Sequence, residues 1–110
     1  DCAVFCAFWR LCYLIVVTMG RTGVDISGHA GYDKQGRDIV CAAVSVLAYN
    51  LVLSLETLTP DQVFVEERQG YTEIIWDDLS ERGRTLVDSF FLGICAIERD
   101  YPGVQIKYGK

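Results

Sequence analysis

The chain has little proline and little histidine: two prolines and a single histidine among 110 residues. Hydrophobic residues make up 51% of it and charged residues 23%, and it contains no internal repeat or low-complexity segment. Sequences that stay disordered throughout are poor in apolar residues, so that class is excluded. A chain of this length can bury a sizeable core without disulfides or metal. We therefore expect residues 1–110 to form a single domain.

Basic residues are also in short supply. Lysine and arginine number 10 against 15 acidic residues, which gives a net charge of −5 and a pI near 4.7. An acidic chain gains nothing from releasing the counterions of a nucleic acid, so direct DNA or RNA binding is not expected. A basic protein or peptide remains a compatible partner.

The five cysteines do not have the pattern of a disulfide framework or of a zinc site. Their number is odd and their spacing irregular, which indicates a reducing compartment. The three cysteines in the first twelve residues are not spaced as in a zinc ribbon, and no histidine accompanies them. We expect no metal and no cofactor. The cysteines are Cys2, Cys6, Cys12, Cys41 and Cys95.

The apolar stretch at residues 2–17 does not have the length of a membrane span. Arg10 interrupts it, it is shorter than the roughly 20 residues that a spanning helix needs, and it lacks a basic leader. We therefore expect a cytoplasmic protein that has no membrane partner. Residues 1–10 carry no motif, which allows an atypical N-terminal extension there.

The first half of the chain predicts a hairpin, a loop and a long helix. Residues 11–18 are rich in β-branched and large apolar side chains and predict a buried strand. Residues 24–27 begin a second strand after a glycine-containing turn. Residues 28–38 combine three glycines with polar side chains, which is typical of a mobile loop. A helix is predicted over residues 39–58.

Two apolar stripes on this predicted helix indicate that it is covered on two sides. One stripe can pack on the sheet, whereas the other needs a partner. We therefore expect a homodimer. The first stripe consists of Val44, Leu47, Leu51, Leu55 and Leu58, and the second of Val46, Tyr49 and Leu53.

The second half of the chain predicts two strands, a helix and a closing strand. The strands cover residues 63–67 and 71–76 and are joined by a short turn. The helix covers residues 80–100, and residues 104–108 alternate apolar and polar side chains in the last strand. The resulting ββαββαβ order predicts an α+β fold, a two-layer sandwich of one mixed sheet packed with two helices.

The only histidine and one of the cysteines lie on either side of the predicted loop. His29 stands where the glycine-rich segment begins, and Cys41 lies in the first turn of the next helix. A helix N-terminus favours the thiolate, and a nearby imidazole favours it further and can protonate a leaving amine. The two residues therefore suit nucleophilic catalysis. Residue type and spacing also allow a structural cysteine and a polar loop histidine.

The sequence around these two residues resembles that of a known family. Residues 27–32 read Ser-Gly-His-Ala-Gly-Tyr, and residues 36–45 read Gly-Arg-Asp-Ile-Val-Cys-Ala-Ala-Val-Ser. Both strings closely resemble the signature of the bacterial ribosomal-processing cysteine protease family, Prp. The ββαββαβ order is similar to that of the family and extends the resemblance to residues 11–108.

The resemblance implies both an activity and a site. Cys41 matches the nucleophile of the family and His29 its general base. The implied protein is a cytoplasmic homodimer that removes the N-terminal extension of large-subunit ribosomal protein number twenty-seven, whose precursor is its peptide substrate. In the family this extension typically ends in aromatic residues at the cut. Supporting or substrate-binding positions fall on Gly28, Tyr32, Asp38 and Ser45.

Several roles stay open at this level. Asp38 could orient His29, bind the substrate or cap the helix, and Ser45 could hydrogen-bond near the sulfur or back to the helix. Tyr32 is a candidate to stack on an aromatic substrate side chain, in a loop that closes over the bound peptide. Two other functions fit the chain: a non-catalytic dimeric interaction domain associated with ribosome assembly, and a thiol redox sensor based on Cys41.

Overall fold

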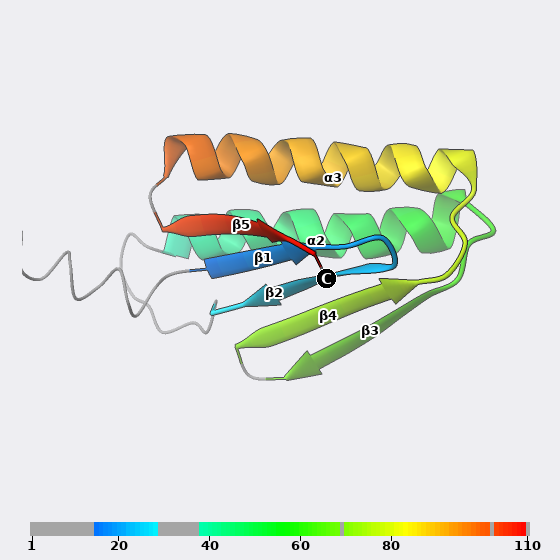
Figure 1. Ribbon diagram of the computed structural model, residues 1–110, viewed down its shortest axis with the longest axis horizontal. Helices are drawn as coiled ribbons and strands as arrows, with labels where there is room; N and C mark the ends of the chain where they lie inside the picture. The colour runs from blue at the N-terminus through cyan, green and yellow to red at the C-terminus, as the bar shows by residue number, and fades with distance from the viewer. Residues whose placement is uncertain (1–14, 29–37, 69, 102, 110) are drawn as a thin grey trace, which may run out of the picture.

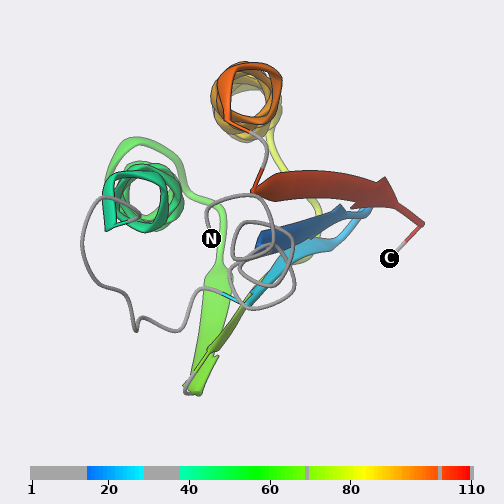
Figure 2. The same ribbon diagram turned by 90° about the vertical axis from the view of Figure 1, so that its left-hand side faces the viewer.

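The protein folds into two layers. The structure is a computed structural model that describes residues 15–28, 38–68, 70–101 and 103–109. In these residues one five-stranded sheet lies against two helices (Figures 1 and 2). The predicted ββαββαβ order and α+β sandwich are confirmed. The elements are β1 (Ile15–Met19), β2 (Gly23–Ser27), α2 (Asp38–Leu58), β3 (Val63–Arg68), β4 (Tyr71–Trp76), α3 (Glu81–Asp100) and β5 (Val104–Tyr108).

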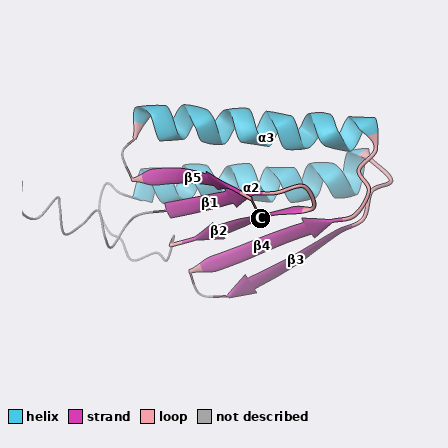
Figure 3. Ribbon diagram, in the orientation of Figure 1, coloured by secondary structure: helices cyan, strands magenta, loops and turns pink. Residues whose placement is uncertain are grey.

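The sheet is mixed, as predicted, and its strands follow the order β3-β4-β2-β1-β5. The pairs β1–β2, β2–β4 and β3–β4 are antiparallel, whereas β1 and β5 are parallel, with Ile15 opposite Val104. The strands β3 and β5 therefore form the two edges, and the β1–β2 hairpin lies inside the sheet (Figure 3).

The core lies between the helices and one face of the sheet. Alternate residues of the strands point into it because side chains of a strand project to opposite faces in turn. Burying one large apolar side chain is worth about 1.5–3 kcal/mol, so these contacts fix α2 on the sheet. The main buried residues are Ile15, Val17, Val24, Ile26, Ile74 and Trp76 of the sheet, Val44, Leu51 and Leu55 of α2, and Phe90 and Ile94 of α3.

The two stripes of α2 meet different surroundings. Val44, Leu51 and Leu55 of the first stripe are buried, as predicted. Leu58 is half exposed at the end of the helix, so its assignment to the buried stripe is wrong. The part of α3 that reaches this last turn is the Arg82 guanidinium, which donates a hydrogen bond to the Leu58 carbonyl at 3.2 Å. The second stripe is exposed in the isolated chain: Val46, Tyr49 and Leu53 have exposed fractions of 64%, 67% and 43%.

The observed elements differ from the predicted ones by a few residues at their ends. The first strand is Ile15–Met19 rather than residues 11–18, and residues 11–14 lie outside the described residues. The helix α2 begins at Asp38 rather than at residue 39. Of the predicted loop at residues 28–38, only its two end positions are described.

The end of α2 and the start of α3 are joined by a hydrogen-bonded cap. The Ser80 hydroxyl accepts a hydrogen bond from the backbone N–H of Gly83 at 3.1 Å, which makes Ser80 the N-cap of α3. Asp61, which follows α2, accepts hydrogen bonds from the Ser80 N–H at 2.9 Å and the Ser80 hydroxyl at 2.8 Å. Partial burial raises the pKa of the Asp61 carboxyl, but the bonds from Ser80 and Thr59 outweigh it and leave that pKa below its usual value.

By length and composition, residues 39–58 would also suffice to cross a membrane, since they form a 20-residue apolar helix. The core helix of a soluble protein passes the same test. Here the helix packs on the sheet through its first stripe, and 22% of the span is buried.

Candidate active site

Cys41 occupies the first turn of α2, as predicted. It is the fourth residue of the helix, is half-buried, and packs at the edge of the core. The first four N–H groups of a helix have no partner inside it and carry partial positive charge. A thiolate and an oxyanion are both stabilised at such a position.

The strand that precedes His29 ends on the same side of the molecule. In Figure 1 the end of β2 and the beginning of α2 lie at the same end of the sandwich. Gly28, just after β2, has a φ of +93°, a left-handed conformation that favours glycine. Its N–H donates a hydrogen bond to the carbonyl oxygen of Gly70 at 2.9 Å, which ties this position to the turn between β3 and β4. The fold therefore brings position 28 to the end of the molecule that holds Cys41.

The structure describes only some of the predicted site residues. Cys41, Ser45 and Gly28 are placed, and Asp38 is placed as the first residue of α2. His29 and Tyr32 lie outside the described residues, as does the side chain of Asp38. The pairing of His29 with Cys41 therefore stays a prediction. The helix start at Asp38 also means that this residue lies within the first turn rather than before the helix.

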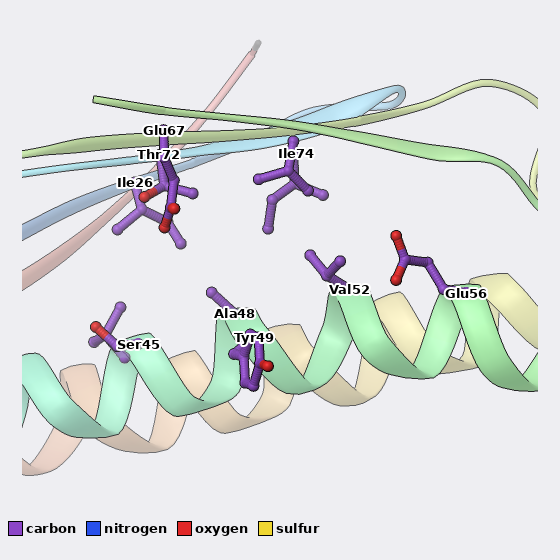
Figure 4. Close-up of a pocket in the computed structure, with 11 residues that line it drawn as sticks. Ile26, Ser45, Ala48, Tyr49, Val52, Glu56, Glu67, Thr72 and Ile74 are labelled. Atoms are coloured by element: carbon purple, nitrogen blue, oxygen red, sulfur yellow. The ribbon is translucent and has the colours of Figure 1, made fainter. Parts of the chain in front are cut away.

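A groove of about 320 Å³ runs along α2, beginning one helical turn beyond Cys41. Ser45, Ala48, Val52 and Glu56 project from α2 toward the sheet in Figure 4. The facing wall is formed by strands β2, β3 and β4. The lining residues of these strands are Ile26, Val65, Glu67, Thr72 and Ile74.

The groove and its two carboxylates, Glu56 and Glu67, are not among the site residues predicted from the sequence. Glu67 belongs to the edge strand β3, and nothing in its own neighbourhood indicates that it faces α2. A signal was present for Glu56: positions 41, 45, 48, 52 and 56 are three or four residues apart, so they follow one line on a helix.

No metal site is evident in the part of the chain that the structure describes. Among those residues no three His, Cys, Asp or Glu side chains lie close enough together to hold an ion.

A cysteine in the first turn of a helix in an α+β sandwich is compatible with thiol-dependent hydrolysis, because the helix N-terminus favours the thiolate. The comparisons with known proteins give the family. Residues 15–107 match the model of the family described as cysteine protease Prp. The chain belongs to the cysteine protease Prp family.

Individual relatives agree with this assignment. The ribosomal processing cysteine protease Prp of Bacillus subtilis is 25% identical over 89 residues, which cover 74% of this chain and 80% of the relative. The crystal structure of the essential ribosomal processing protease Prp from S. aureus, in complex with a substrate peptide, matches with a TM-score of 0.81 at 22% identity, over 87% of this chain and all of that one. A crystal structure from Streptococcus mutans is 32% identical with a TM-score of 0.76, over 87% of this chain and 96% of that one.

Proposed function

We propose that this protein is a cysteine endopeptidase that removes the N-terminal extension of large-subunit ribosomal protein number twenty-seven in the cytoplasm. The observation that carries the proposal is the place of Cys41 in the first turn of α2, at the end of the molecule where β2 leads into His29. Membership of the Prp family supports the peptidase class. The B. subtilis relative is a ribosomal processing protease, which supports the choice of a ribosomal protein as substrate.

In the proposed reaction, His29 accepts the proton of the Cys41 thiol, and the sulfur attacks the scissile carbonyl carbon. The C–S bond forms while the carbonyl oxygen becomes an oxyanion, to which backbone N–H groups at the start of α2 can donate. Collapse of this intermediate breaks the C–N bond, and the proton held by His29 passes to the leaving amine. Water then hydrolyses the thioester: His29 takes a proton from the water, and the hydroxyl adds to the carbon. The C–S bond breaks, and the departing thiolate of Cys41 recovers the proton from His29.

The remaining predicted residues support this reaction in our proposal. Ser45 lies one turn beyond Cys41 and is exposed in the groove, so its hydroxyl is available to a bound peptide. The hydrogen-bonded Gly28 fixes the backbone just before His29. Asp38 is proposed to orient His29 and Tyr32 to stack on an aromatic side chain of the substrate.

We also propose that the active form is a homodimer. Support comes from the exposed second stripe of α2, of which Val46 also lines an apolar surface between α2 and α3. This surface includes Ile39, Ala42, Val46 and Ile97. An exposed apolar face of this kind on a small acidic domain is typical of a protein interface.

The test of the peptidase proposal is cleavage of a peptide that copies the junction between the extension and the mature ribosomal protein. We expect cleavage by the unaltered protein and at least about a thousandfold loss in Cys41→Ala and in His29→Ala, with unchanged circular dichroism. Cys95→Ala is the matched control, because Cys95 is also half-buried but lies in the last third of α3, far from the helix N-terminus. Binding without cleavage would instead indicate an interaction domain, and reversible peroxide oxidation of Cys41 without cleavage would indicate a redox sensor.

A further inference from the structure

The groove along α2 lies beyond the residues that carry out the proposed reaction. Its floor follows one line of the helix, from Ser45 through Ala48 and Val52 to Glu56 (Figure 4). Cys41 lies on the same line, one turn before Ser45. The line of groove residues on α2 therefore leads toward the candidate nucleophile, which does not itself line the groove.

The length of this line corresponds to that of a short extended peptide. Cys41 and Glu56 are separated by about 22 Å along the helix axis, at a rise of about 1.5 Å per residue. An extended peptide advances about 3.3 Å per residue, so about six or seven residues cover that distance. Alternate side chains of such a peptide point to the same side, and two or three of them can enter the groove.

The chemistry of the groove changes along its length. Its middle is apolar, with Val52 of α2 facing Ile74 of the sheet in Figure 4. Val65, which also lines the groove, is the partner of Ile74 on the neighbouring strand β3. A carboxylate lies at each end: Glu67 of β3 on the side of Ser45, and Glu56 at the far end (Figure 4). Both glutamates are exposed and can reach a bound peptide.

We propose that this groove binds the substrate as an extended segment, with bulky apolar side chains between α2 and β3 and a lysine or arginine at Glu56. The basic residue then lies six or seven positions from the scissile bond. This inference rests on the proposed peptidase function and names residues that determine its specificity. The net charge of −5 favours a basic peptide over a second copy of this acidic chain in a groove with a carboxylate at each end.

The charge at Glu56 is tested with pairs of substrate peptides that differ only in lysine or glutamine six or seven positions from the cut, on either side of it. The unaltered protein is expected to prefer the lysine peptide about two- to fivefold in kcat/KM, as an exposed ion pair allows. Glu56→Gln should remove this preference.

Glu66→Gln is the matched control for this substitution and should keep the preference. Glu66 is exposed and loses the same charge, but it lies between the groove residues Val65 and Glu67 on β3. Because side chains alternate along a strand, Glu66 points to the opposite face of the sheet, and it does not line the groove. If the unaltered protein, Glu56→Gln and Glu66→Gln all prefer the lysine peptide to the same extent, the assignment of Glu56 is overturned.

The apolar part of the groove is tested by filling it. Val65→Trp should weaken binding of the uncleaved peptide to the Cys41→Ala protein at least tenfold, measured by fluorescence anisotropy. Phe64→Trp is the matched control, since Phe64 is exposed on the other face of the same strand, opposite Ile75. Unchanged binding in Val65→Trp, with thermal unfolding showing both variants folded, would overturn the proposal.

The outcomes separate this inference from the function on which it rests. Absence of Cys41-dependent cleavage refutes the peptidase, and the binding measurement still decides whether the groove holds a peptide. If the groove variants cleave the peptide with the same lysine preference and bind it as tightly as the unaltered protein, the groove proposal is refuted and the peptidase function stands. A change of sedimentation in Val65→Trp, without a change in peptide binding, would assign the groove to contact between copies and would also overturn the proposal.

Discussion

Asp61 and Ser80 connect the two helices: the Asp61 carboxylate accepts hydrogen bonds from both the N–H and the hydroxyl of Ser80, at 2.9 and 2.8 Å. Asp61 lies just beyond the end of α2, and Ser80 caps the start of α3. The bonds therefore join the helix that holds Cys41 to the second helix of the layer, across the two strands that separate them in sequence.

Loss of the cap should destabilise the fold. Ser80→Ala removes the acceptor for the Gly83 N–H and the hydroxyl that donates to Asp61, and we expect a cost of about 1 kcal/mol. Ser89→Ala, at an exposed position inside α3, should cost less than half as much. Urea unfolding followed by circular dichroism measures both. Equal stabilities of the two variants would contradict the role of Ser80 as a cap.

The lowered pKa of Asp61 predicts a pH dependence of stability. Because the carboxylate is favoured in the folded state, its stabilising effect is present above the unfolded pKa of about 4 and is lost as the pH falls through the lower folded pKa. The free energies of unfolding of the unaltered protein and of Asp61→Asn should therefore converge on acidification below about pH 4. A difference that stays constant from neutral pH into this acidic range would show that this carboxyl is not the titrating group.

Gly83 and Asp61 should be coupled. A Cβ at Gly83 would overlap Oδ2 of Asp61, so Gly83→Ala should destabilise the protein by about 1–3 kcal/mol despite the better helix propensity of alanine. In an Asp61→Ala background the obstacle is gone, and the same change should be neutral or stabilising by up to about 1 kcal/mol. A double-mutant cycle measures this reversal of sign. Additive effects would exclude the coupling.

Cys41 and Cys95 should differ in reactivity although both are half-buried. The helix N-terminus favours the thiolate at Cys41, whereas Cys95 lies in the last third of α3, far from the N-terminus of that helix. At neutral pH we expect iodoacetamide to modify Cys41 at least tenfold faster, measured by mass spectrometry of proteolytic peptides. If iodoacetamide modified Cys41 and Cys95 at equal rates, the position of Cys41 at the helix N-terminus would no longer support its role as the nucleophile.

The exposed stripe of α2 should control self-association. Val46→Glu places a charge in this apolar surface, and we expect the sedimentation coefficient to fall to that of a monomer, with the fold retained. Leu92→Glu is the matched control, since Leu92 is as exposed as Val46 but lies on α3 outside this surface. A dimer that survives Val46→Glu would exclude this face as the interface.

The sequence was sufficient for features that depend on one element at a time. The spacing of Val44, Leu51 and Leu55 predicts both α2 and its buried face, because a helix repeats every 3.6 residues. The motif around Cys41 predicts its place in the first turn for the same local reason. The exposure of Val46 follows from the second stripe.

Features that arise from distant elements could not be predicted in this way. The parallel pairing of β1 with β5 joins residues at opposite ends of the described chain, and no local pattern specifies it. The groove has the same origin, since Glu67 faces α2 only because β3 lies at the edge of the sheet beside β4. The contact of His29 with Cys41 depends on residues outside the described part of the chain.

The pairing of β1 with β5 also has a consequence for synthesis. Ile15 meets Val104, which the ribosome adds about 90 residues later. The edge of β1 that β5 will occupy therefore stays open while the helices are translated, and the sheet is completed only after the last strand has emerged from the exit tunnel. Completion of the sheet is thus a late event in the folding of this domain, and a truncated nascent chain that stops before β5 exposes an unpaired strand edge to aggregation and degradation.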